Sequence, residues 1–290
     1  MSESIKHPHF AFFGTPLFAT IVLDVLELRG YLPSVVITAP DAPKGRKLLI
    51  TPSEVKVWAN ARNIPVLTPK TLRDGKFKEL IAPYQCELFI VAAYGKIIPK
   101  EILDIPKYGT LNVHPSLLPK FRGSSPIESA ILSDEAHTGV TIMALDEELD
   151  HGPIVAQRER IIKDWPPKGS DLTKDLAHFG GSLLSDIIPE WLNGLKGSPQ
   201  DHNRATFTKK ITKEDGLIDL TGDPLHNYKK IRAFDEWPGA YFFIERNGKK
   251  TRIRITDASY VNGVLTITRI IPEGKKEMSY EDFLRGEQKK

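Results

Sequence analysis

The feature that most constrains the fold is the alternation of short apolar strands with amphipathic helices along the first half of the chain. Residues 10–13 are apolar, and after Gly14-Thr15-Pro16 the apolar residues recur at helical spacing. Thr15 suits the N-cap of this helix, Pro16 its first position and Gly30 its end. Further strands are predicted over 34–38, 88–93 and 110–114, helices over 53–62 and 125–132, and a polar loop over 40–52. Such alternation is typical of a parallel α/β sheet.

The pattern changes in the second half of the chain. Two strands are predicted over 138–145 and 154–162, and a long amphipathic helix over 171–195. Beyond Gly197-Ser198-Pro199, short alternating strands over 240–245, 252–256 and 264–270 indicate a small β-barrel. A chain of 290 residues exceeds the usual size of one domain. We therefore predict a Rossmann-like α/β domain over 1–196, a linker over 197–208 and a smaller OB-like barrel over 209–290.

The composition argues against a membrane-embedded chain. Hydrophobic residues make up 40% and charged residues 27%, and no apolar run approaches the roughly 20 residues of a membrane-spanning helix. The first residues lack the apolar stretch of a secretory signal, so a cytoplasmic protein without membrane contact is expected.

Cys86 is the only cysteine, which excludes an internal disulfide and a cysteine-based zinc site. We predict that Cys86 packs beside the run 88–93.

The basic residues are unevenly distributed. The net charge is only +3, yet residues 206–290 hold 17 Lys and Arg against 13 Asp and Glu, while the rest holds 23 against 24. Clusters recur in this last segment, as a surface for phosphates requires. Charge that merely keeps the surface soluble gives the same pattern, and from this feature alone it is the favoured interpretation.

Chemically capable residues gather at two places, 111–123 and 149–152. Asn112 and His114 lie two apart on a predicted strand and therefore share a face at its carboxyl end, where open α/β sheets bind ligands. Asn offers a neutral donor to a developing oxyanion, and His changes protonation state near neutral pH. Asp150, followed by Gly152, could pair with His114 and fix its orientation. Taken singly, each residue is more often structural than catalytic.

The run Asn112-Val113-His114-Pro115-Ser116-Leu117-Leu118-Pro119, with 138–143 and 149–154 downstream, resembles the signature of the folate-dependent formyltransferase family. The resemblance implies that Asn112, His114 and Asp150 form the catalytic trio, with 10-formyltetrahydrofolate as co-substrate and no metal. Asn112 and protonated His114 would stabilise the formyl oxygen, and Asp150 would favour the imidazolium ion. It also implies folate-binding positions at Ala92, Ala93, Tyr94, Ser116, Leu117, Leu118, Pro119, Ile142 and Met143.

Further segments resemble the branch of this family that formylates methionyl initiator tRNA in translation initiation. They are 13–16, 40–46, 51–56, 91–99, 210–216, 231–240 and 272–279, and the likeness covers nearly the whole chain. In that branch the loop with Arg46 is inserted against the acceptor end of the tRNA. The resemblance implies a monomer whose tRNA-binding residues include Lys44, Arg46, Lys47, Lys249, Lys250 and Arg252.

Departures from this branch fall where the acceptor would be recognised. The loop after Arg46 continues as Lys47-Leu48-Leu49-Ile50, which is less basic than usual, and 254–272 leaves room for fewer barrel strands, so the barrel is expected to be shortened. His151 stands where a small residue is usual and is expected to face solvent. Two alternatives stay open: a sugar-amine N-formyltransferase, and a catalytically silent tRNA-binding relative.

Overall fold

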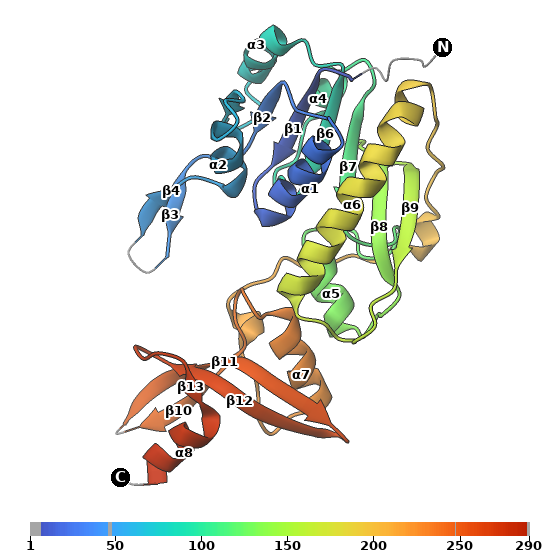
Figure 1. Cartoon of the computed structure of the whole chain (residues 1–290). Coiled ribbons are helices and arrows are strands. Elements are labelled where there is room, and N and C mark those ends of the chain that lie inside the picture. Colours follow the sequence, from blue (N-terminus) through green and yellow to red (C-terminus); the bar gives the residue numbers. More distant parts are fainter. Residues whose placement is uncertain (1–6, 46–47, 247, 289–290) are drawn as a thin grey trace. The chain divides into compact units, whose positions relative to one another are not determined.

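The protein is described by a computed structural model over residues 7–45, 48–246 and 248–288. The chain forms two compact units that interleave along the sequence (Figure 1). Unit 1 comprises Met1–Ser124, Thr138–Arg160 and Thr173–Phe207, and unit 2 comprises Ser125–His137, Ile161–Leu172 and Thr208–Lys290. The units are therefore not simply consecutive, and the boundaries 1–196 and 209–290 remain a prediction about the parts that fold independently.

Unit 1 is built on a seven-stranded sheet of order β5-β2-β1-β6-β7-β8-β9. The first five strands run parallel to one another, and β8 pairs antiparallel with both β7 and β9, which confirms the predicted α/β fold. The parallel strands β1, β2, β6 and β7 are buried throughout, as strands covered on both faces must be. The bounds are β1 (Phe10–Gly14), β2 (Val35–Ile37), β5 (Val66–Leu67), β6 (Leu88–Ala92), β7 (Thr110–His114), β8 (Thr138–Ala144) and β9 (Ile154–Arg160).

Helices cover both faces of this sheet (Figure 1). On one face α6 packs against α1 and the strands through two glycines, because a Cβ on Gly180 would lie 2.6 Å from Val113 Cγ1 and one on Gly181 would lie 2.8 Å from Val25 Cβ. Any larger residue at either position would push the helix away. The bounds are α1 (Leu17–Leu28), α2 (Glu54–Asn60), α3 (Lys76–Ile81), η1 (Ala82–Tyr84), α4 (Lys100–Leu103), α6 (Gly169–Leu192) and η2 (His202–Arg204), the first residues of α6 belonging to unit 2.

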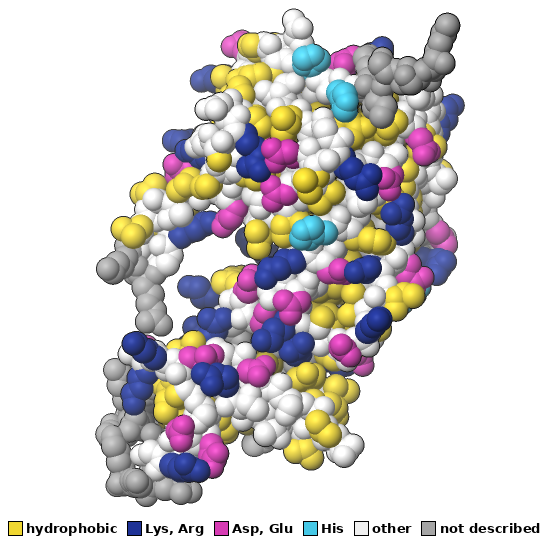
Figure 2. Space-filling view, viewed as in Figure 1, with side chains coloured by type: hydrophobic (Ala, Val, Ile, Leu, Met, Phe, Trp, Pro, Cys, Tyr) yellow, Lys and Arg dark blue, Asp and Glu magenta, His cyan; other side chains and the backbone are white. Residues whose placement is uncertain are grey.

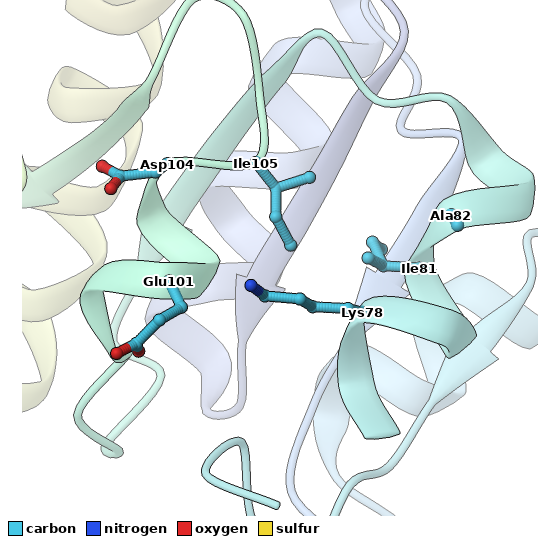
Figure 3. A pocket seen from close by; sticks show the side chains of 6 residues that line it. All are labelled: Lys78, Ile81, Ala82, Glu101, Asp104 and Ile105. Atoms are coloured by element: carbon cyan, nitrogen blue, oxygen red, sulfur yellow. The ribbon is translucent and has the colours of Figure 1, made fainter. Parts of the chain in front are cut away.

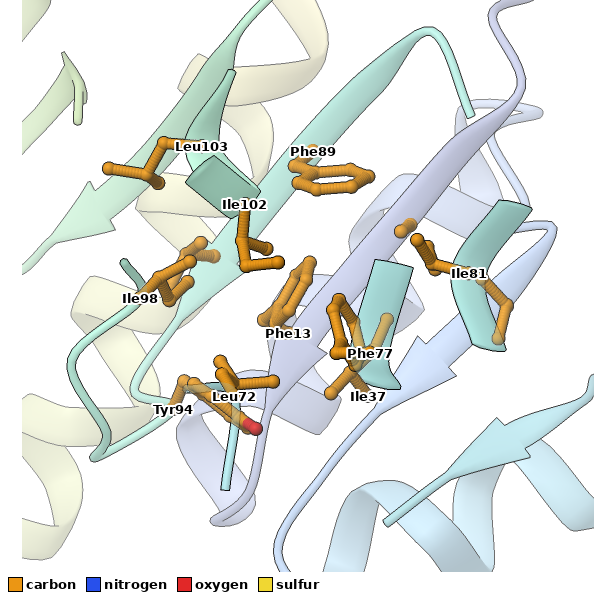
Figure 4. Packing of buried hydrophobic residues seen from close by; sticks show 13 residues of the cluster. Phe13, Ile37, Leu72, Phe77, Ile81, Phe89, Tyr94, Ile98, Ile102 and Leu103 are labelled. Carbon is orange, nitrogen blue, oxygen red and sulfur yellow. The ribbon is translucent and has the colours of Figure 1, made fainter. Parts of the chain in front are cut away.

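The opposite face of the sheet is sealed by an aromatic cluster around Phe13 (Figure 4). The Phe13 ring lies 5.1 to 6.0 Å from the rings of Phe77, Phe89 and Tyr94. Full burial of such a side chain stabilises a fold by about 1.5 to 3 kcal/mol. Burial also raises the pKa of Tyr94 to about 12. This cluster fixes the layer of helices and turns that leads into β7, and therefore the position of the strand that carries Asn112 and His114.

Two local predictions in unit 1 are wrong. The first helix begins at Leu17 with Pro16 at the N-cap, and the Thr15 hydroxyl instead donates to the Tyr94 carbonyl oxygen at 3.4 Å. The polar loop 40–52 contains an antiparallel hairpin of β3 (Ala42–Lys44) and β4 (Leu49–Thr51). The helix end is as predicted, since Gly30 has a φ of 83° that ends a helix without strain.

Unit 2 combines α5 and α7 with a four-stranded antiparallel sheet of order β10-β11-β12-β13. Its core is formed by Ile253, Ile255 and Ile270 with Phe242 and Phe283. A small C-terminal β domain is thus confirmed, although β11 is one 13-residue strand with register shifts near Asp257, rather than several short strands. The bounds are α5 (Pro126–Leu132), η3 (Glu214–Gly216), α7 (Pro224–Ala233), β10 (Tyr241–Arg246), β11 (Lys249–Val261), β12 (Val264–Pro272), β13 (Met278–Ser279) and α8 (Tyr280–Gln288).

Within the residues that the structure describes, no helix combines the length and the apolar character needed to cross a lipid bilayer.

Cys86 is expected to react slowly with alkylating reagents in the folded protein. It packs against the aromatic cluster of unit 1, and burial raises its pKa to about 11 from an ordinary value of 9.0. Because the thiolate is the reacting species, alkylation at pH 8 should be about a hundredfold slower than in the unfolded chain. Timed labelling with iodoacetamide, with and without denaturant, measures the ratio. Equal rates in the two states would show that the thiol is open to solvent.

Candidate active site

The carboxyl end of β7 carries Asn112 and His114, which are 8% and 4% exposed. Val91 of β6 lies opposite Asn112, and across the antiparallel ladder β8 places Met143 opposite Asn112 and Thr141 opposite His114. Side chains alternate along a strand, so Asn112 and His114 lie on one face, the face of the aromatic cluster that includes Val91. The neighbouring strands therefore hold both side chains in fixed directions.

Asp150 is brought to His114 although 36 positions separate them in sequence. The Asp150 Oδ1 atom lies 3.7 Å from His114 Nδ1, longer than a direct hydrogen bond, and both side chains are almost fully buried. The other ring nitrogen, Nε2, lies 3.0 Å from the Phe121 carbonyl oxygen. A carbonyl can only accept, so Nε2 carries a proton and Nδ1 is the atom that faces the carboxylate.

The turn that presents Asp150 is conformationally demanding. Asp150 has a φ of 47°, in the left-handed region that Asp tolerates better than most residues. Gly152 lies so close to β8 that a Cβ there would approach the Ala144 carbonyl oxygen to 1.9 Å. The Asp150 Oδ2 atom accepts from the Gly123 amide at 2.7 Å, which ties this turn to the segment 121–123. Backbone geometry and a direct hydrogen bond thus fix the carboxylate.

A hydrogen-bonded loop follows His114. The Thr141 hydroxyl donates to the Ser116 carbonyl oxygen at 2.7 Å and accepts from the Leu118 amide at 3.1 Å. Gln157 Nε2 donates to the Leu118 carbonyl oxygen at 2.9 Å, and the Ser116 hydroxyl donates to the Lys120 carbonyl oxygen. Residues 116–120 are therefore preorganised beside the site.

The nine predicted folate-binding residues differ in their accessibility. Ala93 is exposed and Leu117 and Pro119 are half-buried, whereas Ala92, Tyr94, Ser116, Leu118, Ile142 and Met143 are buried. Met143 shares the face of Asn112, but Ile142 pairs with Val113, which packs beside Gly180 of α6 on the opposite face. The side chain of Ile142 therefore points away from the site, unlike the expectation that it lines the pocket.

The sequence predicted that His151 faces solvent, but in the structure its ring contacts two other side chains. Its Nδ1 atom lies 2.7 Å from Asp146 Oδ2, and its ring stacks on that of His202 at 4.0 Å with 4° between the planes. His202 Nδ1 in turn lies 2.8 Å from Arg122 Nη2. The chain therefore has a polar network behind the site that sequence reasoning missed. No sequence signal pointed to it, because its members are up to 80 positions apart and follow no motif.

The predicted tRNA-binding residues fall in both units. In unit 1, Lys44 of the hairpin forms a 3.0 Å ion pair with Glu54, while Arg46 and Lys47 lie outside the described residues. In unit 2, Lys250 Nζ lies 4.4 Å from the centre of the Phe243 ring, and Arg252 Cζ lies 3.8 Å from that of Tyr241. Lys249 belongs to the same strand, but its side chain is not among those described. On the face seen in Figure 2, basic and acidic side chains are interspersed.

A separate depression of about 450 Å³ lies between α3 and α4 of unit 1 (Figure 3). It is lined by Lys78, Ile81, Ala82, Glu101, Asp104 and Ile105. The lining residues lie in the segments that lead into β6 and β7, so the depression lies toward the amino ends of these strands and not at Asn112 and His114. Over the described part of the chain, no group of three His, Cys, Asp or Glu side chains is arranged to hold a metal ion.

The doubly wound α/β sheet, with a buried amide, imidazole and carboxylate at a strand's carboxyl end, defines an α/β enzyme suited to acid–base chemistry on a polar ligand. Residues 9–188 match the family described as formyl transferase, and residues 210–263 match its C-terminal domain. The chain belongs to the formyl transferase family.

Relatives with high identity extend along most of the chain. The methionyl-tRNA formyltransferase of Chloroflexus aurantiacus is 46% identical over 235 residues, covering 80% of this chain and 75% of the relative. The methionyl-tRNA formyltransferase of Halalkalibacterium halodurans is 40% identical, covering 95% of this chain and 93% of the relative. The second match covers 95% of this chain, so its likeness includes the C-terminal β domain.

Solved structures share the fold at lower identity. A 4-N formyltransferase from Francisella tularensis aligns with a TM-score of 0.63 at 20% identity, over 84% of this chain and 96% of that one. HypX from Aquifex aeolicus in complex with tetrahydrofolic acid aligns with a TM-score of 0.64 at 17% identity, over 96% of this chain and 47% of that one. At these identities the comparison establishes the fold alone.

Proposed function

We propose that the protein transfers the formyl group of 10-formyltetrahydrofolate to the amino group of methionyl initiator tRNA, in the cytoplasm and as a monomer. Formyl transfer is supported above all by the buried His114–Asp150 pair, which lies on the face of Asn112 in a formyl transferase fold. The acceptor is proposed from the relatives that are 40% to 46% identical over 80% to 95% of this chain. The reaction is a one-carbon transfer that serves translation initiation.

In the proposed mechanism the neutral amine attacks the formyl carbon, and negative charge develops on the formyl oxygen. The Asn112 amide and the Nδ1–H group of the protonated His114 ring donate to that oxygen, while Nε2–H stays bound to the Phe121 carbonyl oxygen. The acid–base steps complete the transfer. As the new N–C bond forms, the bond from the formyl carbon to the folate nitrogen breaks, and the proton of the amine passes to that nitrogen. Asp150 stabilises the imidazolium ion from 3.7 Å and can order the water that relays the proton.

The loop 116–119 and the turn after β6 are the proposed folate contacts. Leu117, Pro119 and Ala93 are the predicted residues with accessible surface, and they offer apolar contact to the flat pterin ring. Ala93 has a φ of 48°, which turns the chain sharply after β6 and leaves this residue exposed at the turn. The hydrogen bonds from Thr141 and Gln157 keep the loop in place before the co-substrate arrives. These residues fit a preformed ligand site.

The proposed tRNA contacts of unit 2 use two cations beside aromatic rings, the exposed Lys250 and the half-buried Arg252. Lys250 and Arg252 lie on one face of β11, because the alternating residues Ile253 and Ile255 are buried in the core. Phe243 is 39% exposed beside Lys250, so this face offers both charge for phosphates and a ring for stacking. Lys44 adds a cation in unit 1, although its pairing with Glu54 lowers its net contribution.

Formylation of methionyl initiator tRNA should exceed that of free methionine or an amino sugar nucleotide by at least about a hundredfold in kcat/KM. The reason is that the phosphate contacts contribute binding energy only the tRNA can supply. The measurement compares the three acceptors with 10-formyltetrahydrofolate at one salt concentration. Preference for the amino sugar nucleotide would replace this proposal by a sugar-amine N-formyltransferase. Tight tRNA binding without formylation of any acceptor would identify a silent tRNA-binding relative.

A further inference from the structure

Behind the site a buried arginine donates to a buried glutamine, which in turn donates to two backbone carbonyls. Arg122 Nε and Nη2 donate to Gln200 Oε1 at 3.2 and 2.7 Å, and the two residues are 3% and 5% exposed. Gln200 Nε2 donates to the carbonyl oxygens of Asp150 and Gly152 at 2.9 and 2.7 Å. Since the guanidinium can only donate and the carbonyls can only accept, this amide orientation alone satisfies all four contacts.

Arg122 lies between the two backbone groups that hold the His114–Asp150 pair. The preceding Phe121 carbonyl accepts from His114 Nε2, and the following Gly123 amide donates to Asp150 Oδ2. Thr206 also holds this segment in place. The Phe121 amide donates to the Thr206 hydroxyl at 2.8 Å, and the Arg122 amide donates to the Thr206 carbonyl oxygen at 2.9 Å. A displacement of Arg122 would therefore move the contacts of both His114 and Asp150.

The contacts close into a ring. Gly123 binds the Asp150 carboxylate, the Asp150 carbonyl binds Gln200, and Gln200 binds Arg122, which adjoins Gly123. His202 adds a further contact to this set of hydrogen bonds. Arg122 Nη2 can only donate, so His202 Nδ1 accepts and carries no proton. The side chain of Asp150 is thus held by Gly123 directly, and its backbone carbonyl is held by Gln200, which is itself bound to Arg122.

We propose that Arg122 and Gln200 are positioning residues that set the separation between His114 and Asp150. This inference deepens the proposed function and rests on it, since it assigns a purpose to the spacing of those two side chains. Neither residue touches the reacting atoms in this scheme. Their role is to keep the carboxylate 3.7 Å from His114 Nδ1, because misplacement of a catalytic group by about 1 Å can cost a hundredfold in rate.

The experiment uses the full-length chain with Gln200→Leu and Gln200→Glu. The glutamate has no N–H for the carbonyls of Asp150 and Gly152. It keeps an acceptor for Arg122, and for that reason it should fold even if the leucine variant does not. Amide hydrogen exchange of Gly123, followed by NMR, reports on the tie to Asp150 without any need for turnover. Turnover of methionyl-tRNA gives kcat and the KM for folate.

We expect Gly123 to exchange at least about tenfold faster in both variants, and kcat to fall about ten- to a hundredfold with the KM for folate within about threefold. Arg62→Leu is the matched control. It removes a guanidinium tie of the same unit, to Glu27 and Asp24, and should change neither value. Unchanged exchange in Gln200→Glu, or faster exchange with an unchanged kcat, would overturn the inference.

The same experiment separates this inference from the proposed function. If His114→Ala and Asp150→Asn turn over normally, the proposed catalytic roles fail. The Gly123 exchange rates would then still show whether Gln200 holds the Asp150 turn, but without a catalytic purpose the positioning role would be overturned as well. If those two variants are inactive while Gln200→Glu behaves like the wild type, only the inference fails.

Discussion

His114→Ala is expected to lower kcat for formyl transfer about a hundredfold or more. The imidazole is the one group of the trio that can both donate to the developing oxyanion and move a proton, and removal of such a group costs about 10² to 10⁴ in rate. Folate binding should stay within about threefold, because the proposed folate contacts come from the loop 116–119 and the turn after β6. The measurement pairs single-turnover rates with the folate dissociation constant.

The control for this variant is His178→Ala. His178 is an exposed histidine of α6 whose Nδ1 lies 2.8 Å from the Lys174 carbonyl oxygen, so its loss should leave kcat unchanged. Thermal unfolding of both variants shows whether the cavity left by the buried His114 ring matters. A folded His114→Ala protein with near wild-type kcat would mean that another residue carries the chemistry.

The strand that carries the site could be predicted to the residue. The run 110–114 is bounded by Gly109 and Pro115, and in it the apolar Leu111 and Val113 alternate with polar residues. Such boundaries depend on local chemistry, so one sequence suffices. The same holds for the glycine at the end of α1.

The hairpin and the long strand β11 could not be predicted in the same way. The run 40–45 contains Pro40, Pro43 and Gly45, which are typical of loops, and only the antiparallel pairing across the turn makes 42–44 and 49–51 strands. Along β11 the register shifts near Asp257 break the alternation of buried and exposed residues. Pairing between distant segments decides both cases, and no local periodicity carries it.

The hydrogen bonds that link Asp150, Gln200 and Arg122 could not be predicted from sequence motifs. The motif contains Asn112 and His114, and Asp150 follows from the family resemblance. Arg122 and Gln200 are 78 positions apart, and their pairing depends on the tertiary path of the chain after α6. The carboxylate's position depends on this long-range tie as much as on its own turn.

Neutralising Lys250 and Arg252 together should weaken tRNA binding and flatten its dependence on salt. Each phosphate contact contributes up to about 0.9 to the slope of log affinity against log salt, so two lost contacts should lower the slope by up to about 1.8. The affinity ratio of wild type to Lys250→Gln/Arg252→Gln should then shrink about tenfold between 50 and 200 mM salt, as binding titrations at several salt concentrations would measure.

The matched control for the tRNA experiment is Arg269→Gln/Arg285→Gln. It removes two positive charges from the same unit, but these pair with Glu277 at 2.9 Å and with Glu281, so local carboxylates already offset them. Its slope should stay close to the wild-type value. Because Arg252 also contacts the Tyr241 ring and the Pro238 carbonyl, Lys250→Gln alone serves as a milder variant with a slope change of up to about 0.9. Equal slopes for all four proteins would remove β11 from the tRNA interface, and an affinity that does not respond to salt at all would favour a small-molecule acceptor.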